Sequence, residues 1–202
     1  MKLVIKNVLQ KIFVNDIVYK LCAPFIYVAN RIKASRFDYI TKANTQRLIA
    51  LADEIFADKI ICNGPFKGIK FSSTASLASS TYAKLLGIYE SEIHPFINQV
   101  LQNKYGLVIN IGCDDGYYAM GFAKFMPGTP VKAYDSNKAA LMKAYDLSVK
   151  NDLQHQISFF GGFFSRDIEK LDAHLKTLFM VDCEGEEKRI FTKQNVHKLI
   201  NA

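Results

Sequence analysis

The 202-residue chain has the composition of a globular protein, with 50% hydrophobic and 22% charged residues, and it is long enough to bury a substantial core. Its net charge of +7 resides in residues 1–47, which contain nine Lys/Arg and two acids, whereas residues 48–202 contain 17 residues of each sign. Zero net charge over the larger part argues against a nucleic-acid-binding groove there, so we expect no nucleic-acid partner.

The cysteines show neither paired nor metal-like spacing. They are Cys22, Cys62, Cys113 and Cys183. We therefore expect reduced thiols, no bound metal and a cytoplasmic location. Lys6, Lys11 and Asp16 interrupt the apolar N-terminal region, which argues against a secretory signal peptide.

Apolar residues recur at helical spacing over residues 2–33, between single lysines. The lysines leave no uncharged stretch of the ~18 residues needed to cross a membrane. Pro24 is expected to end or kink this helix. Two interpretations remain open. The helix packs on its own domain or on a second copy in a homodimer, or residues 1–47 bind peripherally to the anionic inner face of a membrane.

The elements expected before the main domain are short and are separated by turn-forming residues. They are a helix over residues 44–58 with Asn44 as its cap, a turn at 63–65, a short strand at 69–71, and a helical segment over 82–103 interrupted at Gly87 and Pro95. The chain then divides into a basic helical extension (1–60), a connecting segment (61–105) and a main domain (106–202).

Leu107–Ile111 is predicted as a buried strand that leads through a glycine-containing turn into a helix from about Tyr117 to Phe125. Such a unit presents backbone N–H groups and a helix N-terminus at the carboxyl end of the strand, which is the ligand position in open α/β sheets. Gly112 and Gly116 let the backbone turn sharply or approach a ligand closely.

Val131–Asp135 is predicted as a second strand, and its final acid comes 19 positions after Gly116. An acid at this place, roughly 20 residues past the turn, binds ribose hydroxyls in nucleotide-binding α/β units. The turn lacks the G-x-G-x-x-G order of dinucleotide sites and carries Asp114 and Asp115, which would repel a pyrophosphate. A ligand with ribose, adenine and a cationic centre, such as S-adenosyl-L-methionine, fits these charges.

The remainder of the domain continues the alternation of strands and helices. The expected elements are a helix over residues 137–150, a strand over 156–160 ending at Gly161-Gly162, a helix over 168–175, a strand over 177–182 and a helix over 186–200. This alternation predicts an α/β fold with parallel strands and right-handed crossovers.

Three segments together resemble a known family. They are Asn110-Ile-Gly-Cys-Asp-Asp-Gly-Tyr-Tyr118, Ala133-Tyr-Asp135 and Met180-Val-Asp-Cys-Glu-Gly-Glu-Glu187. Their order and spacing are similar to those of class I S-adenosylmethionine-dependent methyltransferases, and Asp-x-Glu-Gly after the fourth strand resembles the FkbM-type branch. The resemblance covers about residues 82–191.

The resemblance implies a Rossmann-like, doubly wound parallel sheet with core strand order 3-2-1-4. The complete family fold has three further strands, so we expect either that the chain is truncated after the fourth strand or that another chain covers that edge. An apolar fourth strand with an open edge would be prone to association.

The resemblance also implies which residues bind the cofactor, S-adenosyl-L-methionine. They are Glu90, Asn110, Gly112, Cys113, Asp114, Gly116, Tyr117, Asp135, Ser136, Gly161 and Asp182. Glu90 would reach the methionine end, and Gly161 would lie beside the adenine. A solvated helix charge at Glu90 and a plain turn at Gly161 are the alternatives.

Asp182 and Glu184 are the candidate catalytic residues, because they follow the fourth strand beside the expected position of the methyl group. Their i, i+2 spacing in an extended chain would direct both carboxylates to one side. Asp182 would orient an acceptor hydroxyl and accept its proton, with Glu184 as its partner. Alternatively, the two acids cap the helix that starts near Gly185.

The predicted function is O-methylation of a small-molecule, sugar or glycan-like acceptor. Two alternatives stay open. A non-catalytic scaffold with a degenerate nucleotide-binding fold would use its basic arm to contact a membrane or a partner. An NAD-dependent oxidoreductase is disfavoured by the missing third glycine and by the acids in the turn.

Overall fold

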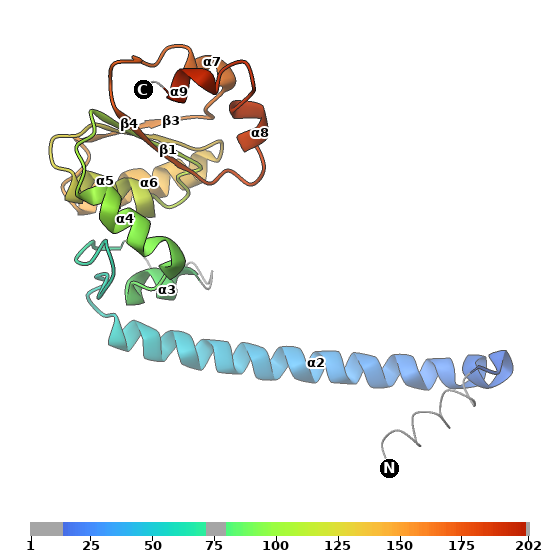
Figure 1. Cartoon of the computed structure of the whole chain (residues 1–202). Coiled ribbons are helices and arrows are strands. Elements are labelled where there is room, and N and C mark those ends of the chain that lie inside the picture. The colour runs from blue at the N-terminus through green and yellow to red at the C-terminus, as the bar shows by residue number, and fades with distance from the viewer. Residues whose placement is uncertain (1–13, 72–79, 201–202) are drawn as a thin grey trace. The chain divides into compact units, whose positions relative to one another are not determined.

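The computed structural model describes residues 14–71 and 80–200, which form two compact units that divide between Ile55 and Phe56 (Figure 1). The part of the predicted N-terminal helix that precedes residue 14 lies outside the described residues. The division of the chain at residues 60 and 105 stays a prediction.

The first unit contains one long helix, α2 (Asp16–Ile55), and none of its residues is buried. The Asn15 side chain accepts hydrogen bonds from the backbone N–H groups of Ile17 and Val18 and so caps its N-terminus. Pro24 was predicted to end or kink a first helix. It does not end the helix, because α2 continues for 31 residues beyond Pro24. Asn44 lies inside α2 and caps no second helix. A proline removes one hydrogen bond, and the alanines, leucines and basic residues that follow favour helix over the rest of the segment.

The segment before the sheet is made of a turn and short helices. Ile60 and Lys70 form an isolated antiparallel bridge where a short strand was predicted. The helices are α3 (Ser80–Leu86), the 3-10 turn η1 (Ser91–Ile93) and α4 (His94–Leu101). Gly87 interrupts the predicted helical segment with φ +74, whereas Pro95 lies in the first turn of α4, where its missing N–H is tolerated.

Four parallel strands form one sheet in the order β3-β2-β1-β4, so the predicted α/β class and the strand order implied by the resemblance are confirmed. The strands are β1 (Leu107–Ile111), β2 (Val131–Tyr134), β3 (Ile157–Phe160) and β4 (Thr177–Val181). Every residue of β1 is buried, because this strand has neighbours on both sides. This arrangement is Rossmann-like, and it places the carboxyl ends of β1, β2 and β4 at one edge of the sheet.

Helices cover both faces of the sheet. In Figure 1, α5 (Tyr117–Phe125) and α6 (Lys138–Lys150) lie on one face, and α7 (Ser165–Ile168), α8 (Glu187–Ile190) and α9 (His197–Ile200) lie on the other. On the second face, Leu107, Ile109 and Ile111 of β1 form one apolar core with Ile168 and Ile190.

The last two predicted helices are wrong in extent. The helix predicted over residues 168–175 is a turn that follows the short α7, and the helix predicted over 186–200 is divided into α8 and α9. Asp172 binds the N–H of His174, and the Asn195 side chain binds both the N–H of Thr192 and the carbonyl of Ile190. These side chains give the backbone hydrogen bonds that compete with a continuous helix.

Candidate functional site

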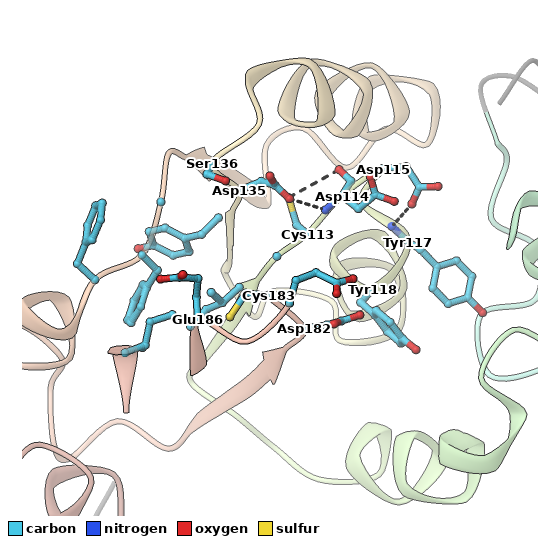
Figure 2. Close-up of a pocket in the computed structure, with 18 of the residues that line it drawn as sticks. Cys113, Asp114, Asp115, Tyr117, Tyr118, Asp135, Ser136, Asp182, Cys183 and Glu186 are labelled. Carbon is cyan, nitrogen blue, oxygen red and sulfur yellow. Dashed lines mark hydrogen bonds between the residues drawn. The ribbon is translucent and has the colours of Figure 1, made fainter. Parts of the chain in front are cut away.

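A cleft of about 950 Å³ opens at the carboxyl ends of β1, β2 and β4 (Figure 2). Its walls come from α3, the β1–α5 turn, the loops after β2 and β3, and the segment between β4 and α8. It is lined by Lys84, Tyr89, Ile111, Gly112, Cys113, Asp114, Asp115, Tyr117, Tyr118, Tyr134, Asp135, Ser136, Gly162, Phe163, Phe164, Ser165, Asp182, Cys183, Glu184, Glu186, Arg189 and Ile190.

The β1–α5 turn needs glycine at two positions. Gly112 has φ +75, and a Cβ there would overlap the carbonyl oxygen of Asp182. Gly116 has φ +87, and a Cβ there would lie 3.0 Å from the Cβ of Ala144. Close approach at Gly112 therefore brings the end of β4 against the turn, and Gly116 lets α5 pack on α6.

Asp135 connects the end of β2 to the β1–α5 turn. Its carboxylate accepts hydrogen bonds from the backbone N–H of Asp114 at 2.9 Å and from that of Asn137 at 2.8 Å. Figure 2 shows Asp135 beside Asp114, with Ser136 next along the chain. These bonds hold the carboxylate at the cleft beside the turn, which is the place that the sequence predicted for a ribose-binding acid.

Sequence reasoning missed Lys84 of α3. Its side chain is 5% exposed, and Nζ lies 2.9 and 2.8 Å from the two carboxylate oxygens of Asp115. The ammonium also lies 5.0 Å from the ring centroid of Tyr89 and 5.5 Å from that of Tyr117. A single lysine in a short helical pattern carries no signal of burial, because most lysines are exposed.

This ion pair corrects the electrostatic argument made from the turn. The charge of Asp115 is compensated by Lys84, and its carboxylate accepts the backbone N–H of Tyr117 at the start of α5. Asp114 is 79% exposed on its side chain and 4.0 Å from Lys84 Nζ. A ligand in the cleft therefore does not meet two uncompensated negative charges at Asp114 and Asp115, because Lys84 neutralises that of Asp115.

Glu90 is not among the residues that line the cleft, although it contacts Tyr118, which does line it. It has φ +47, and its carboxylate accepts a hydrogen bond from the Tyr118 hydroxyl. Burial, followed by this hydrogen bond, raises the pKa of Tyr118. Burial also raises the pKa of Tyr117 to about 12, so the tyrosine wall is uncharged near neutral pH.

Asp182 and Glu184 both line the cleft, but in a different geometry from the one predicted. Glu184 has φ +55 and lies in a turn, so the argument from i, i+2 spacing in an extended chain is wrong. Burial, and then the nearby Glu90 and Glu184 carboxylates, raise the pKa of Asp182. The N–H of Cys183 donates to Glu187 at 2.9 Å, so Glu187 is the acid that binds the backbone of the turn before α8.

Four of the predicted cofactor residues do not line the cleft, namely Glu90, Asn110, Gly116 and Gly161. Asn110 is 1% exposed, and its amide donates to the carbonyl of Met180 at 3.3 Å, while its Oδ1 has no partner among the described residues. A Cβ at Gly161 would meet nothing within 4 Å, so no close approach needs glycine there. Gly162 and the adjacent Phe163 and Phe164 line the cleft instead.

The charge of the cleft is negative, since six carboxylates and two basic side chains line it. Lys84 pairs with Asp115, and the exposed Arg189 pairs with Glu186 at 3.0 Å. Within residues 14–71 and 80–200, no three His, Cys, Asp or Glu side chains are grouped to hold a metal ion. The excess of carboxylates favours a cationic group over an anionic one in the cleft.

No protein-family model matches the chain, and no curated protein matches it. Among solved structures it is similar to one titled "Crystal structure of MccD protein", with 19% identity, a TM-score of 0.32, and coverage of 37% of this chain and 32% of that chain. It is also similar to an O-methyltransferase family protein from Burkholderia thailandensis, with 15% identity, a TM-score of 0.40, and coverage of 63% of this chain and 37% of that chain. The chain thus spans about a third of the length of each, and at this distance neither likeness assigns an activity.

Proposed function

We propose that the cleft binds S-adenosyl-L-methionine and that the protein is an O-methyltransferase of the FkbM type, acting on a small-molecule, sugar or glycan-like acceptor. The observation that carries the proposal is the Asp135 carboxylate, hydrogen-bonded to the backbone of the glycine turn within a negatively charged cleft. The sequence resemblance over residues 82–191 supports the same activity.

The residues fit this cofactor in charge and in backbone geometry. Asp135 offers carboxylate oxygens to ribose hydroxyls, and the backbone of Gly112 lines the cleft beside it. Phe163 and Phe164 offer aromatic surface for an adenine.

When bound, the cofactor supplies a methyl group that is activated by a sulfonium. The protein's own contribution is to align the acceptor, to exclude water and to accept a proton. Asp182 suits the last role, because its raised pKa makes the carboxylate a stronger base than an ordinary aspartate. Glu184 lines the same cleft and supports Asp182 by orienting the acceptor.

Calorimetric titration of the full chain with S-adenosylmethionine, its demethylated product S-adenosylhomocysteine, and NAD tests the proposal. We expect binding of the first two and not of NAD. In Asp135→Ala the affinity for S-adenosylhomocysteine should fall by about 10- to 100-fold, roughly the equivalent of losing one hydrogen bond to a charged group.

Asp146→Ala is the matched control, since Asp146 is an exposed acid on α6 that does not line the cleft. It should bind as the wild type does. Equal affinities of the Asp135→Ala variant and the wild type would refute the ribose contact. Tight binding of NAD alone would favour the oxidoreductase, and binding of none of the three ligands would favour a scaffold.

A further inference from the structure

Lys84 is a buried cation inside a cleft that is otherwise acidic. Taking an ammonium out of water is unfavourable unless its charge and its three N–H groups find partners. Two of these groups are directed to the two oxygens of Asp115, at 2.9 and 2.8 Å. Nζ also lies over the rings of Tyr89 and Tyr117, and 4.0 Å from a carboxylate oxygen of Asp114. Among the described residues, the third N–H group forms no hydrogen bond, so it can donate to a ligand in the cleft.

The amino-acid end of S-adenosylmethionine carries a carboxylate, and a cleft with six acids has few places for it. The other basic residue that lines the cleft, Arg189, is 81% exposed on its side chain and pairs with Glu186. The Lys84 side chain is almost completely buried, is held by its ion pair with Asp115 and lines the same cleft as the β1–α5 turn. A charge-assisted hydrogen bond is strongest in such a position, because water does not compete for it.

We infer that Lys84 binds the carboxylate of the cofactor's methionine part, and that Asp115 holds the Lys84 ammonium in position for this contact. This inference rests on the proposed function. Lys84 is then a specificity residue, because it separates ligands that carry this carboxylate from otherwise identical ligands that lack it. Asp115 takes part both here and at the start of α5, where it accepts the N–H of Tyr117.

The test compares S-adenosylmethionine with decarboxylated S-adenosylmethionine, which lacks only the carboxylate. The wild type should bind the first about 10- to 100-fold more tightly. Lys84→Met should remove most of this preference by weakening the binding of S-adenosylmethionine, while the affinity for the decarboxylated ligand changes by less than about threefold. Lys67→Met, at an exposed lysine outside the cleft, should retain the preference.

Three outcomes separate the inference from the proposed function. An equal loss of affinity for both ligands in Lys84→Met would show that the lysine only maintains the fold. Equal affinity of the wild type for both ligands would overturn the inference without the need for a variant. Failure of the wild type to bind either ligand would overturn the proposed function itself. Because Lys84→Met leaves Asp115 unpaired, the double variant Lys84→Met/Asp115→Asn serves if the single variant does not fold.

A second, independent observation concerns the first part of α2, residues 16–32. The charged residues Asp16, Lys20 and Arg31 are four and eleven positions apart, so they share one side of the helix. Leu21, Phe25, Val28 and Ile32 follow at helical spacing on the other side. Leu21 is 70% and Phe25 is 79% exposed, although both are large and apolar.

The apolar side is wide and adjoins a concentration of positive charge. Ile17 and Ile26, both exposed, extend it beyond the narrow seam that a two-helix coiled coil would cover. Residues 1–47 carry the whole net charge of +7. None of the helices in the described residues is long and apolar enough to cross a membrane. We propose that residues 16–32 lie in the surface of an anionic lipid bilayer, with the apolar side inserted.

Sedimentation with vesicles of phosphatidylcholine containing phosphatidylglycerol tests this. The full chain should sediment with these vesicles and not with pure phosphatidylcholine. Phe25→Glu should abolish sedimentation, whereas Asn30→Glu, which changes the charge equally near the charged side, should weaken it only slightly. Equal loss in both variants would refute insertion of the apolar side. Absence of sedimentation together with a dimer that Phe25→Glu dissociates would assign the surface to a second copy of the chain.

Discussion

Replacing Gly112 by alanine tests whether the end of β4 approaches the β1–α5 turn as closely as the structure has it. At φ +75 a side chain costs about 1–2 kcal/mol of backbone strain. The new Cβ would also overlap the carbonyl oxygen of Asp182, and relief of that overlap costs a further 1–3 kcal/mol, roughly the range for overpacking in a core. We therefore expect a loss of about 2–5 kcal/mol in the free energy of unfolding.

Two other glycines separate the contributions of strain and overlap. Gly128 has φ +82 but open space around it, so Gly128→Ala should lose only the strain, about 1–2 kcal/mol. Gly161 has neither the positive φ nor a neighbour within 4 Å, so Gly161→Ala should stay within about 0.5 kcal/mol of the wild type.

Urea unfolding followed by tyrosine fluorescence is a suitable assay, because the chain has no tryptophan and Tyr117 and Tyr118 are buried beside the turn. If Gly112→Ala loses no more stability than Gly128→Ala, the close approach of Asp182 to the turn is wrong. The placement of Asp182, the proposed base, beside the β1–α5 turn would then be wrong as well.

Three further substitutions test the environment of the site. The raised pKa of Asp182 means that the folded protein binds the proton of this carboxyl group more tightly than the unfolded chain does. Protonation of Asp182 therefore stabilises the folded state below the ordinary pKa of 3.8. This stabilisation is lost as the pH rises through the pKa of the folded state. Asp182→Asn should therefore have a higher urea midpoint than the wild type at pH 7 and no advantage at pH 3, and an equal advantage at both pH values would contradict the shift. Burial, and then the hydrogen bond to Glu187, raise the pKa of Cys183 to about 11. At pH 8 a disulfide reagent should modify Cys183 more slowly than the exposed Cys62, and Glu187→Gln should accelerate the reaction of Cys183, while an unchanged rate would rule out the effect of Glu187. Tyr118→Phe removes the hydroxyl that binds Glu90 and should lower the free energy of unfolding by about 1.5–3 kcal/mol, whereas Tyr19→Phe on α2 should leave it unchanged; equal effects would show that the Glu90 contact is not made.

The local pattern of the sequence was sufficient for the parts of the fold whose residues interact with near neighbours. The apolar run Leu107–Ile111 and the helix that begins at Tyr117 were predicted at the bounds that the structure has. The acid at position 135 was placed correctly beside the turn, because parallel strands bring their carboxyl ends to one edge of a sheet. The short helices after β3 and β4 were less predictable, since Asp172 and Asn195 redirect the backbone through hydrogen bonds of their own.

The sequence by itself determined the alternation of strands and helices and the glycine turn, because hydrophobic period and turn residues are local properties. Only the tertiary structure decided the charge of the site. Lys84 and Asp115 are 31 positions apart, and they pair because α3 is packed against the turn. The turn conformation of Glu184 and the contact between Gly112 and Asp182 depend in the same way on where β4 ends beside β1. Ion pairs and close backbone contacts form between segments distant in sequence, so they follow from packing, which no local pattern of residue types encodes.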